Sequence, residues 1–131
     1  MPHLRVSEAA SLLGVSDDTM RRWIDQGRLR ATRANARRMT VEGRDLAALA
    51  QELAAEQEPG LHTSARNQLR GIVTHVLKDT VMAQVELQCG PFRVVSLMSA
   101  EAVDELGLEP GVVALASIKA TQVVVALPPE R

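Results

Sequence analysis

A short polar stretch just past the middle of the chain carries the groups that a small oxyanion needs. From Ser64 the sequence reads Ser-Ala-Arg-Asn-Gln-Leu, which places a hydroxyl, a guanidinium and two amides close together with little apolar bulk. A guanidinium binds anions through directional, charge-assisted hydrogen bonds, and hydroxyls add donors without adding charge. We therefore expect this stretch to form part of an anion site.

Composition excludes several other classes of protein. The chain has 131 residues, of which 46% are apolar and 2% aromatic, enough for one domain or two small ones. No apolar run approaches the ~18 residues that span a bilayer, and the N-terminus lacks a signal-peptide core. The single cysteine, Cys89, fits a reducing compartment and is expected to be a small buried residue. We expect a cytoplasmic protein without a membrane partner.

Catalytic and metal-binding patterns are not found in the sequence. His3, His62 and His75 lack the spacing of metal ligands, and no glycine-rich phosphate loop follows a predicted strand. No nucleophile is placed beside a base. We therefore expect neither an enzyme nor a metal ion held directly by side chains.

Charge divides the chain into two parts. Residues 1–45 hold nine arginines against six acids, whereas residues 46–131 hold six basic residues against ten acids. Such asymmetry is a hint that the basic part contacts nucleic acid. Pro59 and Gly60 mark a linker. We therefore predict a domain over 1–56, a linker over 57–63 and a second domain over 64–131.

The basic part has the pattern of two short helices and a third, longer one. Ser7 is predicted to cap a helix that ends at Gly14, and Ser16 a second helix that runs to about residue 26. A tight turn between two helices is typical of a helix-turn-helix. An arginine-rich stretch over 28–38 follows, and Thr40 is predicted to cap a third helix over 41–56.

This part resembles a known family of DNA-binding domains. The runs LRVSEAASLLGVS from Leu4 and TMRRWIDQGRL from Thr19 are similar to the winged helix-turn-helix of MerR-like and excisionase-like proteins. The resemblance implies that the second helix enters the major groove of double-stranded DNA and that a β-wing, the hairpin over 28–39, contacts the backbone. A basic ribbon without acids suits phosphate contact. The expected DNA contacts are Thr19, Arg21, Arg22, Arg28, Arg30, Arg33, Arg37 and Arg38.

The second part of the chain has strand patterns. Alternation along 81–88 places Val85 and Leu87 inward, and a Pro110-Gly111 pair is typical of a type II turn. Ser99 is predicted to cap a short helix with Val103 and Leu106 buried. Strands are predicted over 69–78, 81–88, 92–98, 112–120 and 122–126. Five short strands and one helix favour a small closed barrel.

The same part resembles the Mop/TOBE domain of molybdate-binding proteins. The motifs in the family's order are SARNQLRG at 64–71, VMA at 81–83, LGLEPG at 106–111 and IKAT at 118–121. The resemblance implies an OB-like five-stranded barrel that binds molybdate or tungstate between subunits or tandem copies. The oxyanion contacts that it implies are Ser64, Ala65, Arg66, Asn67, Ser99, Lys119 and Ala120.

Together these patterns predict an α+β protein of two domains, a winged helix-turn-helix followed by an OB-like barrel. The combination resembles the ModE-type regulators in logic, so we expect a transcription regulator that responds to molybdate or tungstate. Because the family's sites are shared, a homodimer or a hexamer is expected. The alternative is a molybdate-storage protein whose first domain has no regulatory role.

Overall fold

The chain folds as two compact units, Met1–Glu58 and Pro59–Arg131. The computed structural model describes residues 2–35, 38–57 and 60–129. The division falls inside the segment that the sequence marks as a linker, and each unit has its own buried core. Nowhere in the described ranges is there a helix with the length and apolar content to cross a membrane.

The first unit, over its described residues, packs three helices against a three-stranded antiparallel sheet in the order β1-β3-β2. Its core is built around Met20, Val41 and Leu49, whose side chains are fully buried and come from three different elements. The strand β1 was not predicted, because three residues are too short for an alternation signal. The elements are β1 His3–Arg5, α1 Val6–Leu13, α2 Asp17–Asp25, β2 Ala31–Asn35, β3 Arg38–Glu42 and α3 Gly43–Ala55.

The two helices of the predicted helix-turn-helix form, with one change at the first cap. Ser16 is the N-cap of α2, and its Oγ accepts a hydrogen bond from the backbone N–H of Thr19 at 3.1 Å, as the sequence predicts. Gly14 ends α1. The prediction that Ser7 caps α1 is wrong. The chain passes directly from β1 into the helix, so the N-cap is Arg5 and Ser7 lies in the first turn.

Replacing Ser16 with alanine should lower the free energy of unfolding of this unit by about 1 kcal/mol, because the Thr19 N–H loses its acceptor. The chain has one tryptophan, Trp23 in α2, so fluorescence during denaturation reports on this unit. Ser11→Ala is the matched control, since Ser11 is an exposed serine within α1. Equal stability of the two variants would contradict the capping role.

The third helix begins later than predicted. Thr40 does not cap it, and Val41 lies in β3 with no exposed surface. The reason is pairing on both sides, because β3 is the central strand and Val41 is opposite both Leu4 and Ala31. Sheet pairing and burial therefore decide this stretch, and α3 starts after Glu42.

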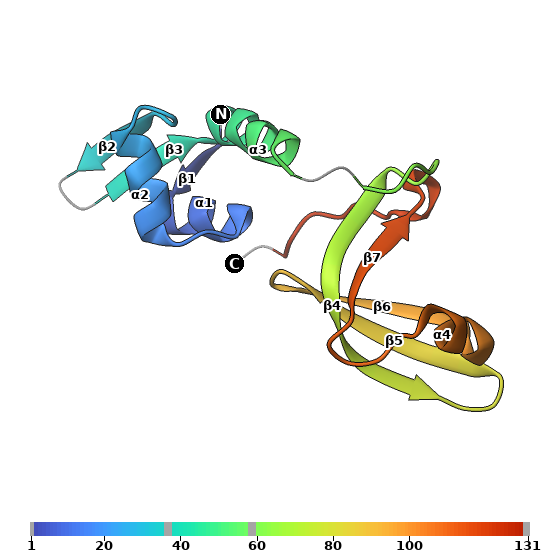
Figure 1. Ribbon diagram of the computed structural model, residues 1–131. Helices are drawn as coiled ribbons and strands as arrows, with labels where there is room; N and C mark the ends of the chain where they lie inside the picture. The colour runs from blue at the N-terminus through green and yellow to red at the C-terminus, as the bar shows by residue number, and fades with distance from the viewer. Residues whose placement is uncertain (1, 36–37, 58–59, 130–131) are drawn as a thin grey trace. The chain divides into compact units, whose positions relative to one another are not determined.

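The second unit is a strongly staggered antiparallel sheet with one short helix. Strand β4 is long and curved, and its first half pairs with β7 while its second half pairs with β5 (Figure 1). A register shift between Val73 and His75 accompanies this change of partner and bends the strand. The strand order is β6-β5-β4-β7. The elements are β4 Asn67–Lys78, β5 Met82–Cys89, β6 Phe92–Ser99, α4 Ala100–Leu106, β7 Val113–Ile118 and the 3-10 turn η1 Ala120–Gln122.

The core of this unit follows the predicted alternation of β5. Val85, Leu87 and Cys89 are buried, and Val103 of α4 packs with them. Ser99 caps α4 as predicted, with its Oγ accepting from the N–H of Ala102 at 3.0 Å. The prediction that Leu106 is buried is wrong: the side chain is 67% exposed at the last position of α4.

The predicted fifth strand does not form. Residues 120–122 make η1, and within the described chain residues 123–129 pair with no strand. The segment has the composition of a strand, yet no edge of its own sheet accepts it. Val124, Val125 and Leu127 are consequently 91%, 87% and 92% exposed. The described residues therefore form a four-stranded curled sheet rather than a closed five-stranded barrel.

Candidate functional site

The beginning of β4 brings two distant predicted anion contacts to the same edge of the sheet. Asn67 starts β4 and is opposite Ile118, the last residue of β7. The Asn67 Nδ2 also donates a hydrogen bond to the Ile118 carbonyl oxygen at 3.1 Å. Because the two strands are antiparallel, Arg66 directly before one and Lys119 directly after the other lie at this edge.

The side chains of these two cationic residues are exposed. Neither Arg66 nor Lys119 forms an ion pair with any residue that the structure describes. Positive charges at the same end of a strand pair attract an anion, and a dianion can accept hydrogen bonds from both groups. Ser64, two residues before Arg66, adds an exposed hydroxyl, and Ala120 follows Lys119 at the start of η1. The arrangement suits a tetrahedral oxyanion.

Two of the predicted contacts have a structural role within the chain. Ala65 is buried, and its N–H donates to the Thr63 Oγ1 at 3.3 Å. The Asn67 amide is used in the bond to β7. Their packing leaves Ser64 and Arg66 exposed on either side of Ala65.

Ser99 lies at the opposite end of β4. It is opposite Met82 in β5, beyond the pair formed by Ala83 and the last residue of β4, Lys78. A strand of twelve residues spans up to ~40 Å. Within one chain Ser99 and Arg66 therefore lie at opposite ends of a long strand.

Two carboxyl groups of this unit, those of Asp79 and Glu86, have hydrogen-bond partners within the sheet and its turns. The backbone N–H groups of Met82 and Val81 donate to Asp79, which holds the pKa of that carboxyl below its ordinary value. A hydrogen bond from Arg93 lowers the pKa of Glu86 in the same way. Both acids stabilise turn and strand structure. Among the described residues, no three His, Cys, Asp or Glu side chains gather as metal ligands.

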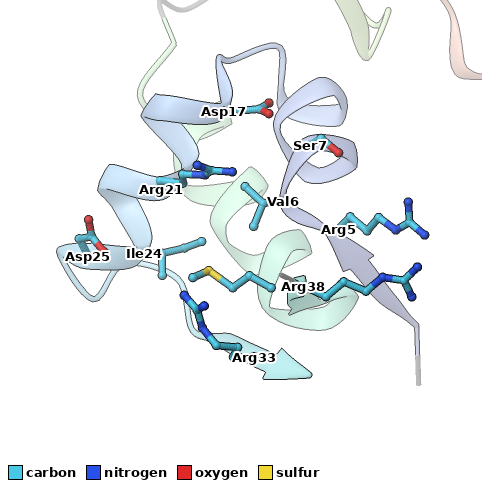
Figure 2. A pocket seen from close by; sticks show the side chains of 10 residues that line it. Arg5, Val6, Ser7, Asp17, Arg21, Ile24, Asp25, Arg33 and Arg38 are labelled. Carbon is cyan, nitrogen blue, oxygen red and sulfur yellow. The ribbon is translucent and has the colours of Figure 1, made fainter. Parts of the chain in front are cut away.

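The first unit has a basic groove of about 460 Å³ between α2 and the sheet (Figure 2). Four arginines and two aspartates line it, together with Ser7 and apolar side chains. Arg5 and Arg38 extend in the same direction from neighbouring strands, while Arg21 and Arg33 lie on the other side (Figure 2). The excess of positive charge along an open groove suits the phosphates of a nucleic acid.

Comparison with known proteins gives separate matches for the two units. A family model described as the TOBE domain matches residues 63–125, and one described as a helix-turn-helix domain matches residues 4–54. Molybdenum-pterin-binding proteins 1 and 3 of Clostridium pasteurianum are 40% and 41% identical over 63 residues, which cover 47% of this chain and 93% of each relative. The chain belongs to the TOBE-domain family.

Two solved structures with similar chains are described as molybdate-binding proteins. A molybdate-binding protein from Sporomusa ovata is 31% identical, covering 51% of this chain and 100% of its own, with a TM-score of 0.49. The cytoplasmic molybdate-binding protein ModG, with molybdate bound, is 41% identical and covers 53% of this chain and 50% of its own, also with a TM-score of 0.49. The relatives therefore match about half of this TOBE-domain protein.

In this TOBE-domain protein, the predicted DNA contacts fall into separate groups. Arg21, Arg33 and Arg38 line the groove, whereas Arg22 is exposed on α2 outside its lining. Thr19 takes part in the α2 cap, where its Oγ1 accepts from Ser16 at 3.0 Å. Arg37 lies outside the described residues.

Arg28 and Arg30 face acids of α3 instead of lining the groove. Arg28 lies 3.8 Å from Glu52 and 3.6 Å from Glu56, with its guanidinium 5.4 Å from the centre of the Trp23 ring. Arg30 lies 3.8 Å from Asp45. Both arginines tie the start of the hairpin to α3.

Arg5 is the groove residue that the sequence reasoning missed. It precedes α1 and stands apart from the arginine-rich hairpin, so no local cluster indicated a role. Pairing of β1 with β3 places it opposite Thr40, on the strand that carries Arg38. A prediction of β1 as a third strand beside the hairpin would have identified it.

Proposed function

We propose that this chain is a cytoplasmic transcription regulator, and not an enzyme, that binds double-stranded DNA in response to molybdate or tungstate. The TOBE domain binds the oxyanion where copies of it meet, and the helix-turn-helix domain, of the winged MerR-like type, presents α2 and the hairpin to DNA. In logic it is comparable to ModE-type regulators.

One observation carries the proposal. Arg66 and Lys119 flank the terminal Asn67–Ile118 pair at the β4–β7 edge, and neither forms an ion pair with a described residue, in a domain whose relatives are named for molybdenum. A molybdate dianion brings its metal inside an oxygen shell, so the protein needs hydrogen-bond donors and positive charge rather than metal-ligating side chains. The basic groove on the same chain provides the DNA-binding surface.

Two features of the single chain favour a homo-oligomer: the position of Ser99 and the exposed apolar segment 123–127. Ser99 lies at the other end of β4 from the cationic edge, and the segment 123–127 exposes valines and a leucine to solvent. Exposed apolar segments beside an open sheet edge mark association surfaces. We therefore propose a dimer or a larger assembly, including a hexamer, that covers this segment.

The direct test is binding of the protein to duplex DNA from its own upstream region, measured with molybdate, tungstate, sulfate or no added anion. The expected result is a change in DNA affinity with molybdate or tungstate and none with sulfate. By linkage, DNA shifts the affinity for the effective anion by the same factor. Equal DNA affinity in all four conditions would contradict the regulator.

A molybdate-storage protein is the second candidate. The relatives of this chain from Clostridium pasteurianum match its TOBE domain over 93% of their own length, so they consist almost entirely of that domain. Storage predicts molybdate binding without salt-dependent retention on random duplex DNA at low salt. The regulator predicts both. A protein that binds DNA and shows no molybdate heat would instead use its TOBE domain only for assembly.

Arg5→Ala should weaken DNA binding uniformly across sequences and reduce the slope of log affinity against log salt by about 1, the effect of losing one phosphate contact. The reason is the position of Arg5 at the groove, where it forms no ion pair with a described residue. Arg44→Ala is the matched control, because Arg44 is exposed on α3 outside the groove lining. Identical salt slopes for the two variants would contradict a contact between Arg5 and DNA.

A further inference from the structure

The side-chain amide of Gln68 closes the loop that carries the anion contacts. Its Oε1 accepts a hydrogen bond from the Leu61 N–H at 2.8 Å, and its Nε2 donates to the Leu61 carbonyl oxygen at 3.0 Å. The same Nε2 lies 3.4 Å from the Ala65 carbonyl oxygen. Gln68 thus pairs with a backbone residue at both its donor and its acceptor, as a neighbouring strand would.

Residue 60, which lies against the Gln68 amide, has to be a glycine. A Cβ atom added to Gly60 would lie 1.7 Å from the Gln68 Oε1 and 2.8 Å from its Cδ. Any side chain at residue 60 therefore displaces the amide. Gly60 lies close against the Gln68 amide, and this contact fixes the position from which the segment 60–66 leads into β4.

The loop is held at its base and at its end. Gln68 secures Leu61, and the Asn67 amide secures the start of β4 to Ile118 of β7. Between these two anchors Ala65 is buried, while Ser64 and Arg66 stay exposed. The predicted anion contacts Ser64 and Arg66 thus lie in a loop whose geometry depends on the side chain of Gln68.

We propose that Gln68 is a positioning residue for the oxyanion site, which keeps Ser64 and Arg66 in their binding geometry before the anion arrives. This inference rests on the proposed binding of molybdate by the TOBE domain. A loop that is already ordered loses less conformational freedom on binding, so preorganisation raises affinity without any contact between Gln68 and the anion.

The test is a double-mutant cycle at Gly60 and Gln68, with sodium molybdate titrated calorimetrically into the full chain. Gln68→Ala and Gly60→Ala should each raise the Kd by about tenfold, because each releases the loop. The double variant should bind no more weakly than Gln68→Ala alone, since the added methyl group then meets no amide. Additive losses in the double variant would overturn the proposed contact.

A general loss of stability is distinguished by amide hydrogen exchange and by a control. The N–H of Leu61 should exchange faster in Gln68→Ala, while the N–H groups of the β4–β7 ladder keep their protection. Gln88→Ala is the matched control, because the Gln88 Nε2 donates to the Gly90 carbonyl oxygen at another turn, 3.0 Å away. Its molybdate Kd should stay unchanged.

Failure of this inference differs from failure of the proposed function. If the unmodified chain binds molybdate and Gln68→Ala binds it equally well, Gln68 has no positioning role and the oxyanion site stands. If the unmodified chain gives no heat with molybdate, the oxyanion site itself is rejected and the positioning role falls with it.

Discussion

Arg66→Ala should raise the Kd for molybdate by about 100-fold, the largest effect expected from a single side chain. A hydrogen bond to a charged group contributes about 1.5–3 kcal/mol, and the arginine also supplies one of the two positive charges at the β4–β7 edge. The side chain is exposed and forms no ion pair with a described residue, so its removal should leave the fold intact.

Calorimetry with molybdate and with sulfate measures this loss. Arg93→Ala is the arginine control, because Arg93 pairs with Glu86 on the sheet and should leave the molybdate Kd unchanged. Lys119→Ala should weaken binding less than Arg66→Ala, since an ammonium group provides charge without the paired geometry of a guanidinium. Equal heats for the unmodified chain, Arg66→Ala and Lys119→Ala would reject the site at this edge.

Local signals in the sequence identified much of the fold. The Ser16 cap and the alternation of β5 depend on neighbouring residues alone, and both were predicted correctly. The same holds for the turn at Gly111, where φ is 100° and the Val112 N–H donates to the Glu109 carbonyl oxygen at 3.1 Å. Such features need no knowledge of distant partners.

Errors in the fold prediction arose where distant pairing decides the structure. Thr40 and Val41 have the sequence of a helix start, yet they lie in the central strand β3, which pairs with β1 on one side and β2 on the other. The segment 122–126 has the sequence of a strand, yet its own sheet offers it no partner. Neither outcome can be obtained from the residues of the segment itself.

The candidate sites show the same division. Arginines 28, 30, 33 and 38 give one uniform basic signal in the sequence. Only the packing of α3 reveals that Arg28 and Arg30 face acids, whereas Arg33 and Arg38 line the groove. Family resemblance named both Arg66 and Ser99 as anion contacts, but the sheet register was needed to show that they lie at opposite ends of β4.

Replacing Val124 and Val125 together with aspartate should dissociate the assembly into monomers. In one isolated chain both side chains are almost fully exposed, so the change would have little effect on a monomer. In an assembly that covers them, burial of two valines stabilises each protomer by about 3–6 kcal/mol, and burying an unpaired carboxylate is strongly unfavourable. The same substitution therefore separates the two states.

Sedimentation velocity gives the oligomeric state, and Leu12→Asp is the control for an exposed apolar residue in the other unit, where Leu12 is 65% exposed. The control should sediment like the unmodified chain. If the aspartate variant also does so, the segment 123–127 is not an interface. Loss of both assembly and molybdate binding in this variant, with Arg66 and Lys119 unchanged, would show that the anion site is completed by a second copy, because neither valine can itself hold an oxyanion.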